Sequence, residues 1–237
     1  MVINEERCVG CGLCVNYCPA HAISIHEKKA VIDLDLCFEC GNCKYANVCK
    51  KDAFVQQTMT WPRVIRSIFS NVRIISPNTN LSGRGTEEMK TNDVTGRFKP
   101  GAIGIACEMG RPGTGTTFKD VETIAKVVVG HGGKLEEKNP TFFVFDDPSK
   151  GTIKKEFLNE RALSVIIEAL VEKENLIPLL ENLKEAQNMI DTVFSLDVIS
   201  VMEDEKIFTN DLIEKAGLKA RPNGKTCLGL GRPRKEF

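Results

Sequence analysis

Eight of the ten cysteines of this 237-residue chain lie within its first 49 residues. They form two strings, Cys-x2-Cys-x2-Cys-x3-Cys-Pro and Cys-x2-Cys-x2-Cys-x5-Cys. Steps of x2 in a tight loop gather successive thiolates around one corner-sharing cube and keep backbone N–H groups aimed at the sulfurs. The two strings therefore predict a ligand set for two iron–sulfur clusters. Its members are Cys8, Cys11, Cys14 and Cys18, and then Cys37, Cys40, Cys43 and Cys49.

Two other uses of cysteine fit this pattern poorly. A disulfide framework needs a secreted chain, and residues 1–7 show neither a basic nor an apolar leader region. Structural zinc sites use paired Cys-x2-Cys knuckles about a dozen or more residues apart, not three consecutive x2 steps followed by Cys-Pro. Oxygen-sensitive thiolate centres imply a reducing compartment, so we expect a cytoplasmic protein, and the cluster chemistry suggests anaerobic metabolism.

Residues 1–55 resemble a bacterial-type ferredoxin domain that carries two [4Fe–4S] clusters. The resemblance rests on Cys8-Val-Gly-Cys-Gly-Leu-Cys-Val-Asn-Tyr-Cys-Pro19 and Cys37-Phe-Glu-Cys-Gly-Asn-Cys43. Each half of this region reads as a cysteine loop, a short helical turn and a strand. In such tandem motifs the fourth thiolate comes from the other motif. The resemblance thus implies one cluster on Cys8, Cys11, Cys14 and Cys49, and a second on Cys37, Cys40, Cys43 and Cys18.

The second motif departs from the family pattern at its end. Five residues separate Cys43 from Cys49, and Lys50 stands where proline is expected. We expect the two extra residues to lift the backbone near the cluster that Cys49 serves. Because potential follows hydrogen bonds and solvent access at the sulfurs, the two clusters are predicted to differ in reduction potential.

The charge of the cysteine-rich region favours a built-in relay over a free shuttle. Residues 1–55 carry 7 acids and 6 bases, so they lack the acidic surface that steers a soluble shuttle to its partners. The 182 residues that follow are enough for one further domain. We predict a ferredoxin domain at 1–58, a connecting segment at 59–100, and an α+β domain with a C-terminal helix and basic tail at 101–237.

The connecting segment is rich in arginine and glycine. Residues 56–100 hold 7 bases against 3 acids, with a helix or extended arm expected at 63–75 and one capped helical turn at 86–89. Gly-Arg pairs recur there and later in the chain. Glycine nests and guanidinium forks suit carboxylates or phosphates, although plain turns with salt bridges would look the same. The candidate anion-binding residues are Arg84, Arg97, Arg111 and Arg232.

The two cysteines outside the two strings each precede a Gly-Arg-Pro sequence. Cys107 and Cys227 could be ligands or nucleophiles, but lone intracellular cysteines are usually small buried residues. No phosphate-binding loop and no dinucleotide fingerprint is present, so the sequence makes no case for ATP or a Rossmann-bound nucleotide.

Residues 101–202 alternate between strand and helix periodicity in the order β-α-β-β-α-β. This order predicts an α+β sandwich of ferredoxin-like topology, which ACT-like regulatory modules share. His131 falls at the end of the first helix, where a cap-region role is expected, and residues 209–218 predict a short helix capped by Thr209. The expected strands lie at 102–107, 134–137 with 141–145, 162–171 and 191–201, and the expected helices at 118–129 and 176–186.

The middle of the chain supports a second resemblance. Through the strings at residues 83–97 and 107–113, the whole chain, over about residues 1–235, is similar to the amino-terminal region of 6-hydroxynicotinate reductase, a ferredoxin-dependent family that reduces a pyridine ring. Full reductases of that kind are longer chains. The resemblance therefore leaves open whether this chain is itself an enzyme.

Three functions follow, in order of preference. The first is an electron-transfer protein or subunit that passes low-potential single electrons to a partner reductase. The second is a reductase that binds a small anionic aromatic acid near its arginines; its two-electron chemistry would want a flavin, for which no motif is recognisable. The third is a redox-linked ACT-like sensor. We expect a redox partner protein, no nucleic acid and no membrane span, and edge strands that allow a homo-oligomer.

Overall fold

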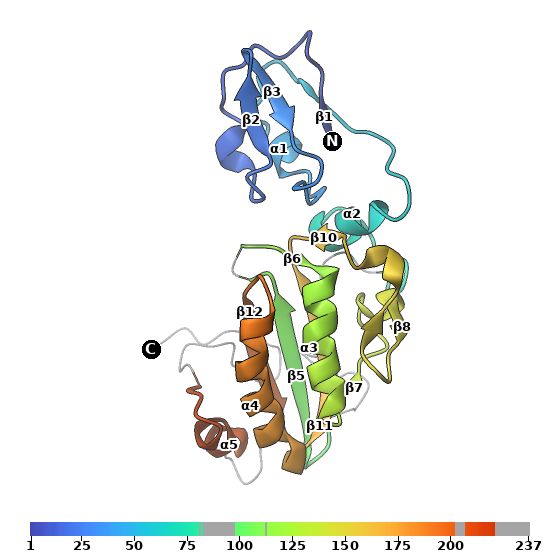
Figure 1. Cartoon of the computed structure of the whole chain (residues 1–237), viewed down its shortest axis with the longest axis vertical. Coiled ribbons are helices and arrows are strands. Elements are labelled where there is room, and N and C mark those ends of the chain that lie inside the picture. The colour runs from blue at the N-terminus through green and yellow to red at the C-terminus, as the bar shows by residue number, and fades with distance from the viewer. Residues whose placement is uncertain (81, 83–97, 112, 202–206, 221–237) are drawn as a thin grey trace.

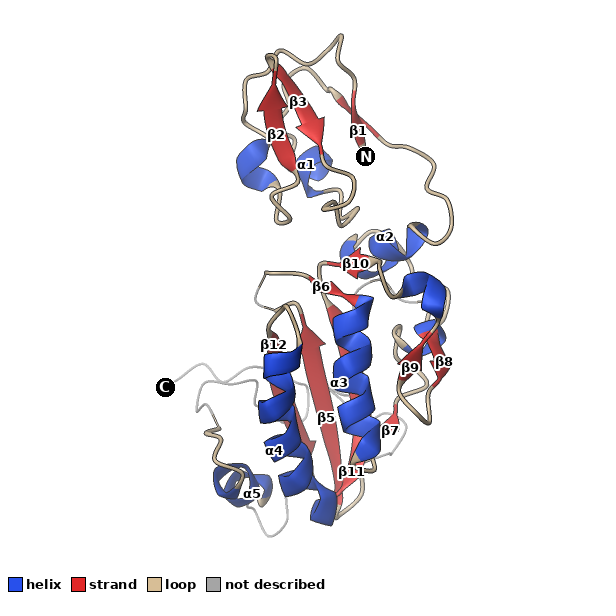
Figure 2. Cartoon of the chain, viewed as in Figure 1, coloured by secondary structure: helices blue, strands red, loops and turns tan. Residues whose placement is uncertain are grey.

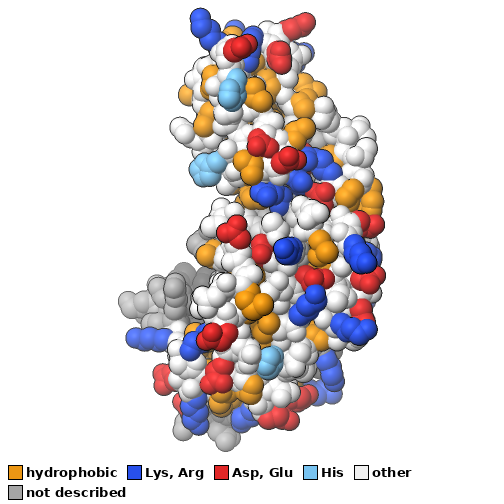
Figure 3. All heavy atoms as spheres, in the orientation of Figure 1, with side chains coloured by type: hydrophobic (Ala, Val, Ile, Leu, Met, Phe, Trp, Pro, Cys, Tyr) orange, Lys and Arg blue, Asp and Glu red, His pale blue; other side chains and the backbone are white. Residues whose placement is uncertain are grey.

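The computed structural model describes residues 1–80, 82, 98–111, 113–201 and 207–220. The N-terminal part forms one end of the molecule, the α+β part forms the other, and helix α2 (Val64–Ser70) lies between them (Figure 1). The chain has a formal net charge of +0, and on the face drawn in Figure 3 basic and acidic side chains are interspersed.

The N-terminal part is a duplicated unit. Strand β1 (Val2–Ile3) pairs with β4 (Phe54–Val55), and β2 (Ile23–His26) pairs with β3 (Lys29–Ile32), both antiparallel. Each half contains a cysteine loop followed by one short helical turn, η1 (Val15–Tyr17) in the first and α1 (Asn42–Tyr45) in the second. The predicted order of loop, turn and strand is therefore present in both halves.

The larger part is a sheet with two helices on one face (Figure 2). Its strand order is β12-β5-β11-β7, antiparallel throughout, and it includes β5 (Ala102–Met109) and β11 (Val165–Glu172) at its centre. The covering helices are α3 (Phe118–Gly130) and α4 (Leu176–Ala186). The edge strands are β7 (Lys134–Leu135) and β12 (Phe194–Ser200). The predicted β-α-β-β-α-β order is thus observed.

Helix α3 begins and ends where its sequence indicates. The Thr117 hydroxyl accepts the Asp120 N–H at 3.2 Å while the Asp120 carboxylate accepts the Thr117 N–H, which forms a capping box. The predicted apolar stripe of Val121, Ile124, Ala125 and Val128 is fully buried. At the other end His131 is the C-cap residue, and its Nδ1 lies 2.8 Å from the Val127 carbonyl oxygen, so its predicted capping role is confirmed.

Two local predictions are wrong. Residues 141–145 form no strand of the main sheet: η2 (Phe142–Val144) is a 3-10 turn, and β8 (Phe145–Asp147) pairs with β9 (Thr152–Ile153). Their aromatic run fills the core beside α2, where Phe143 stacks on Phe69. Helix α5 (Thr209–Lys215) begins after Phe208, and no side chain caps it. The hydroxyl of Thr209 instead lies 3.2 Å from that of Ser200.

The remaining short elements lie at the end of the sheet nearest α2. Strand β6 (Thr116–Thr117) pairs with β10 (Arg161–Ala162), and η3 (Lys155–Phe157) precedes β10. Ile65 and Phe69 of α2 are fully buried in the same core as α3 and α4. Helix α2 therefore belongs, by its packing, with the α+β part of the molecule. The chain also contains η4 (Lys173–Asn175) and η5 (Gln187–Met189).

Candidate metal centre

The eight clustered cysteines line two separate cavities, each bordered by four thiols. One cavity contains three cysteines of the first string and the last of the second; the other contains three of the second string and the last of the first. The first group is Cys8, Cys11, Cys14 and Cys49, and the second is Cys18, Cys37, Cys40 and Cys43. The chain thus brings the cysteines together in the two predicted sets, and their role as cluster ligands stays a prediction. We name these sets quartet 1 and quartet 2.

The two cysteine loops have the same backbone contacts and left-handed residues at equivalent positions. The N–H of Cys8 donates to the Asn4 carbonyl oxygen at 3.0 Å, and that of Cys37 donates to the Asp33 carbonyl oxygen at 3.1 Å. Left-handed residues also recur, at Gly12 and Gly41 within the loops. Such backbone conformations turn the loop sharply and favour glycine.

Backbone amides point at the sulfurs in both quartets. Ala30 and Ala53 donate to the Sγ atoms of quartet 1 at 3.3 and 3.4 Å, and Ala22 and Glu39 donate to those of quartet 2 at 3.3 and 3.4 Å. N–H···S bonds of this kind stabilise sulfur that carries negative charge and help to set the potential of an iron–sulfur centre.

The extra residues before Cys49 are accommodated without altering its immediate surroundings. They follow α1, where Asn47 adopts a left-handed φ of 52°. Cys49 then receives the same type of bond from the amide four residues later as Cys18 does. The expected lifting of the backbone and the predicted difference in potential both stay predictions.

The thiols of the quartets fit a positively charged centre. Burial, together with negative charge on Cys40, Cys37 and Cys18, raises the pKa of Cys43 to about 12. Burial also raises the pKa of Cys14, in the other quartet. Thiolates held this close together need a bound cation for compensation, which a metal centre supplies. Within the described residues, no three His, Cys, Asp or Glu side chains lie close enough together to hold a single metal ion.

The two quartets have different surroundings. Quartet 1 lies beside the surface: Cys11 is exposed, and its neighbours Val9 and Leu13 are 59% and 54% exposed. Its cavity has a volume of about 190 Å³. The cavity of quartet 2 is narrower, about 20 Å³, and its lining includes the buried residues Phe38 and Glu39.

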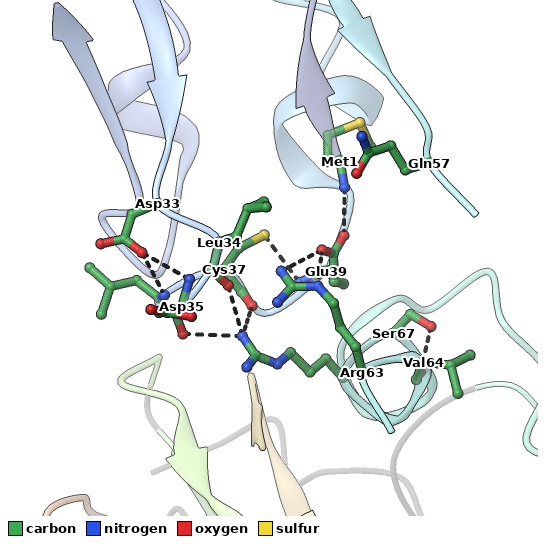
Figure 4. A network of polar contacts seen from close by, with 12 residues as sticks. Met1, Asp33, Leu34, Asp35, Cys37, Glu39, Gln57, Arg63, Val64 and Ser67 are labelled. Carbon is green, nitrogen blue, oxygen red and sulfur yellow. Dashed lines mark hydrogen bonds and ion pairs between the residues drawn. The ribbon is translucent and has the colours of Figure 1, made fainter. Parts of the chain in front are cut away.

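Glu39 marks the clearest difference between the two loops. Its φ is 54°, and the equivalent position in the first loop is Gly10, where a Cβ would meet the Lys28 carbonyl oxygen at 2.1 Å. The Glu39 carboxylate accepts from the Met1 amino group at 2.8 Å and from Arg63 at 2.7 Å (Figure 4). Burial alone would raise the pKa of Glu39, but these two cations hold it below its ordinary value.

Helix α2 supplies a third cation, Arg66, to the same loop. The Nη1 atom of Arg66 donates to three carbonyl oxygens, those of Leu34 at 3.0 Å, Asp35 at 3.1 Å and Cys37 at 2.9 Å, while Nε pairs with Glu160. Sequence reasoning missed this contact. Arg66 and Glu160 are 94 residues apart, and no local pattern connects them.

Of the remaining candidates, Arg111 and Cys107 lie within the described residues. Arg84, Arg97, Arg232 and Cys227 lie outside the described residues. Arg111 forms an ion pair of 2.7 Å with buried Glu108 at the end of β5. Cys107 is fully buried on β5, and burial raises its pKa to about 12, as expected for a small core residue. No helix in the described residues is long and apolar enough to cross a membrane.

Comparison with known proteins agrees with this N-terminal site. A family described as "4Fe-4S binding domain" matches residues 1–24. Indolepyruvate oxidoreductase subunit IorA of Pyrococcus abyssi is 44% identical over 54 residues, which make up 22% of this chain and 8% of that subunit. The same subunit of Thermococcus kodakarensis is 44% identical over 52 residues, again 8% of its length. No solved structure matches the chain.

A shorter relative matches over almost its whole length. Ferredoxin Fdx2 of Sorangium cellulosum is 30% identical over 98 residues, which make up 40% of this chain and 93% of that ferredoxin. The thiols and these matches indicate an iron–sulfur protein of the ferredoxin type, with a 4Fe–4S binding domain at its N-terminus. The chain belongs to the ferredoxin family. The resemblance to 6-hydroxynicotinate reductase receives no support from these matches.

Proposed function

We propose that this chain holds two [4Fe–4S] clusters, one on each quartet, and relays low-potential single electrons through them to a partner reductase. The observation that carries the proposal is the pair of cavities lined by four thiols each, with amide donors on both sets of sulfurs. The clusters would supply the one-electron chemistry. The protein's own part is to position the thiolates and to set the charge around them.

The surroundings of the quartets support a direction for the relay. Exposed Cys11, with Val9 and Leu13 beside it, offers an apolar edge where a redox protein could approach quartet 1. Quartet 2 faces α2, and the ring of Phe38 lies against Gly115 of the α+β domain, which we place at 101–237. Electrons would therefore enter at quartet 1 and leave by way of quartet 2.

The relatives support a role within a larger redox system. The IorA proteins carry the name of a subunit of an oxidoreductase, and the chain matches less than a tenth of their length. A ferredoxin segment joined to a second domain is suited to serve one such partner. We propose this in place of a freely diffusing shuttle because residues 1–55 are nearly neutral.

Anaerobic purification followed by metal analysis and EPR tests the proposal. We expect iron and sulfide sufficient for two four-iron clusters in each chain, and EPR signals from both after reduction with dithionite. Zinc without iron would contradict the proposal. Flavin absorbance, or turnover of 6-hydroxynicotinate by the chain alone, would replace the relay with the reductase function.

A further inference from the structure

In both halves of the N-terminal part, a cationic side chain donates to two backbone carbonyl oxygens at equivalent positions of the cysteine loop. In the first half, Nζ of Lys29 donates to the carbonyl oxygens of Glu5 and Cys8, both at 2.6 Å. In the second half, Arg66 donates to the carbonyl oxygens of Leu34 and Cys37. Glu5 and Leu34 each precede the first cysteine of their motif by three residues, so the two contacts are equivalent.

The origin of the cation differs between the halves. Lys29 belongs to β3, inside the cysteine-rich part, whereas Arg66 belongs to α2, which packs in the core of the other part. The environment differs as well, because Lys29 is half-buried and the Arg66 side chain is only 7% exposed. Solvent and salt screen a buried charge far less than an exposed one. Arg66 therefore acts more strongly on its loop than Lys29 does.

Burying a guanidinium group costs free energy unless opposite charge or hydrogen-bond acceptors compensate its charge. Glu160 pairs with Nε of Arg66, but Nη1 is directed at carbonyl oxygens alone, among them that of a quartet 2 cysteine. This arrangement aims one edge of the guanidinium group at the cluster loop. One-electron reduction adds one negative charge to a cluster and forms or breaks no bond, so a nearby positive charge favours the reduced state.

We propose that Arg66 is a positioning residue for electron transfer: it raises the reduction potential of the cluster on quartet 2, and reduction of that cluster strengthens the hold of α2 on the cluster loop. The inference rests on the proposed function, because it requires a cluster on each quartet. The second half of the proposal follows from the first. A contact that favours the reduced cluster must itself be favoured by reduction, to the same extent.

Redox titration of the anaerobically purified full chain, followed by EPR, tests the effect on potential. In Arg66→Gln we expect one of the two potentials to become more negative, with the reduction equilibrium changing about tenfold, or about 59 mV for one electron. Arg66→Lys keeps the charge and should retain most of the potential. Lys29→Gln is the matched control, and it should move the other potential by a smaller amount.

Hydrogen exchange on the unaltered protein tests the linkage without any variant. The amides of Val64–Ser70 should be better protected after reduction with dithionite than before it, and Arg66→Gln should remove that difference. Equal protection in both states would overturn the linkage. The effect on potential would be overturned if Arg66→Gln and Lys29→Gln moved the same potential. It would also be overturned if Arg66→Lys shifted the potential as far as Arg66→Gln does. In either case two clusters in the unaltered chain would leave the proposed function standing, whereas their absence would overturn both.

Discussion

At the scale of single residues, Cys18 and Cys49 are the most informative ligands, because each is predicted to serve the cluster of the opposite motif. Cys18→Ala should remove the cluster of quartet 2, and Cys49→Ala that of quartet 1. Redox titration identifies which cluster survives. The potential left in Cys18→Ala should equal that in Cys40→Ala, and the potential left in Cys49→Ala should equal that in Cys11→Ala. Agreement of Cys18→Ala with Cys11→Ala would show that each motif holds its own cluster.

Cys107 is predicted to be chemically inert. Burial raises its pKa to about 12, so near neutral pH the thiol is protonated and very little of the attacking thiolate is present. Iodoacetamide should leave Cys107 unmodified in the folded protein, with no increase between about pH 7 and 9. Denaturation should expose it, and mass analysis of its peptide provides the measurement. Alkylation of the native protein that accelerates with pH would contradict this prediction.

At the scale of elements, Glu122 connects α3 to β9. Its carboxylate accepts the Ile153 N–H at 2.9 Å and the Lys126 ammonium at 2.7 Å. Burial by itself would raise the pKa of Glu122, but these bonds hold it below the ordinary value. Because the pKa of Glu122 is lower in the folded protein, its carboxylate contributes its full stabilisation above the unfolded pKa of about 4.3. This contribution is lost as the pH falls through the folded pKa.

Glu122→Gln should therefore lower the free energy of unfolding by about 1 kcal/mol at pH 7. The difference from the unaltered protein should shrink as the pH falls below about 4, where the native carboxylate also becomes protonated. Urea unfolding at several pH values provides the measurement. Lys126→Gln is the control: it keeps the bond to Ile153 and should cost less. A loss for Glu122→Gln that does not vary with pH would rule out this linkage.

The elements also show what sequence can and cannot predict. Helix α3 follows from its own residues, because the apolar spacing and the Thr117 cap are local. The prediction for residues 141–145 fails for the opposite reason: an aromatic, β-branched run suits a strand, whereas the observed contacts of Thr141 with Ile166 and of Phe143 with Phe69 are made with residues distant in sequence. The quartets are predictable because the spacing marks their cysteines and the resemblance to tandem motifs implies which cysteine joins which set. Arg66 is not, since its partners at 34–37 and at Glu160 come together only in the folded chain.

At the scale of the whole molecule, Phe38 and Gly115 determine how closely the two parts approach. A Cβ on Gly115 would lie 2.1 Å from the Phe38 ring, and Gly115 also has a φ of 75°. Gly113 has a similar φ of 64° but open space around it, so it is a matched control. Gly113→Ala should cost about 1–2 kcal/mol for its backbone conformation alone. Gly115→Ala should cost about 1–3 kcal/mol more, because the ring must move.

Thermal unfolding of the anaerobic protein compares the two glycine variants. Gly115→Ala should unfold at the lower temperature, and Phe38→Leu in the same chain should recover part of the loss. The cluster next to Phe38 should also shift in potential in Gly115→Ala and stay unchanged in Gly113→Ala. Equal melting temperatures for the two glycine variants would show that Phe38 does not limit the approach.

Trp61 is the one tryptophan of the chain. Its indole Nε1 donates to Glu156 Oε1 at 3.1 Å, and its ring meets that of Phe157 edge-on with centroids 5.0 Å apart. It lies just before α2 in sequence, yet both of these partners belong to the α+β part. The fluorescence emission of Trp61 should therefore change if α2, which carries Arg66, leaves its place on the α+β part. Tryptophan fluorescence would therefore report on the junction through which the electrons would pass.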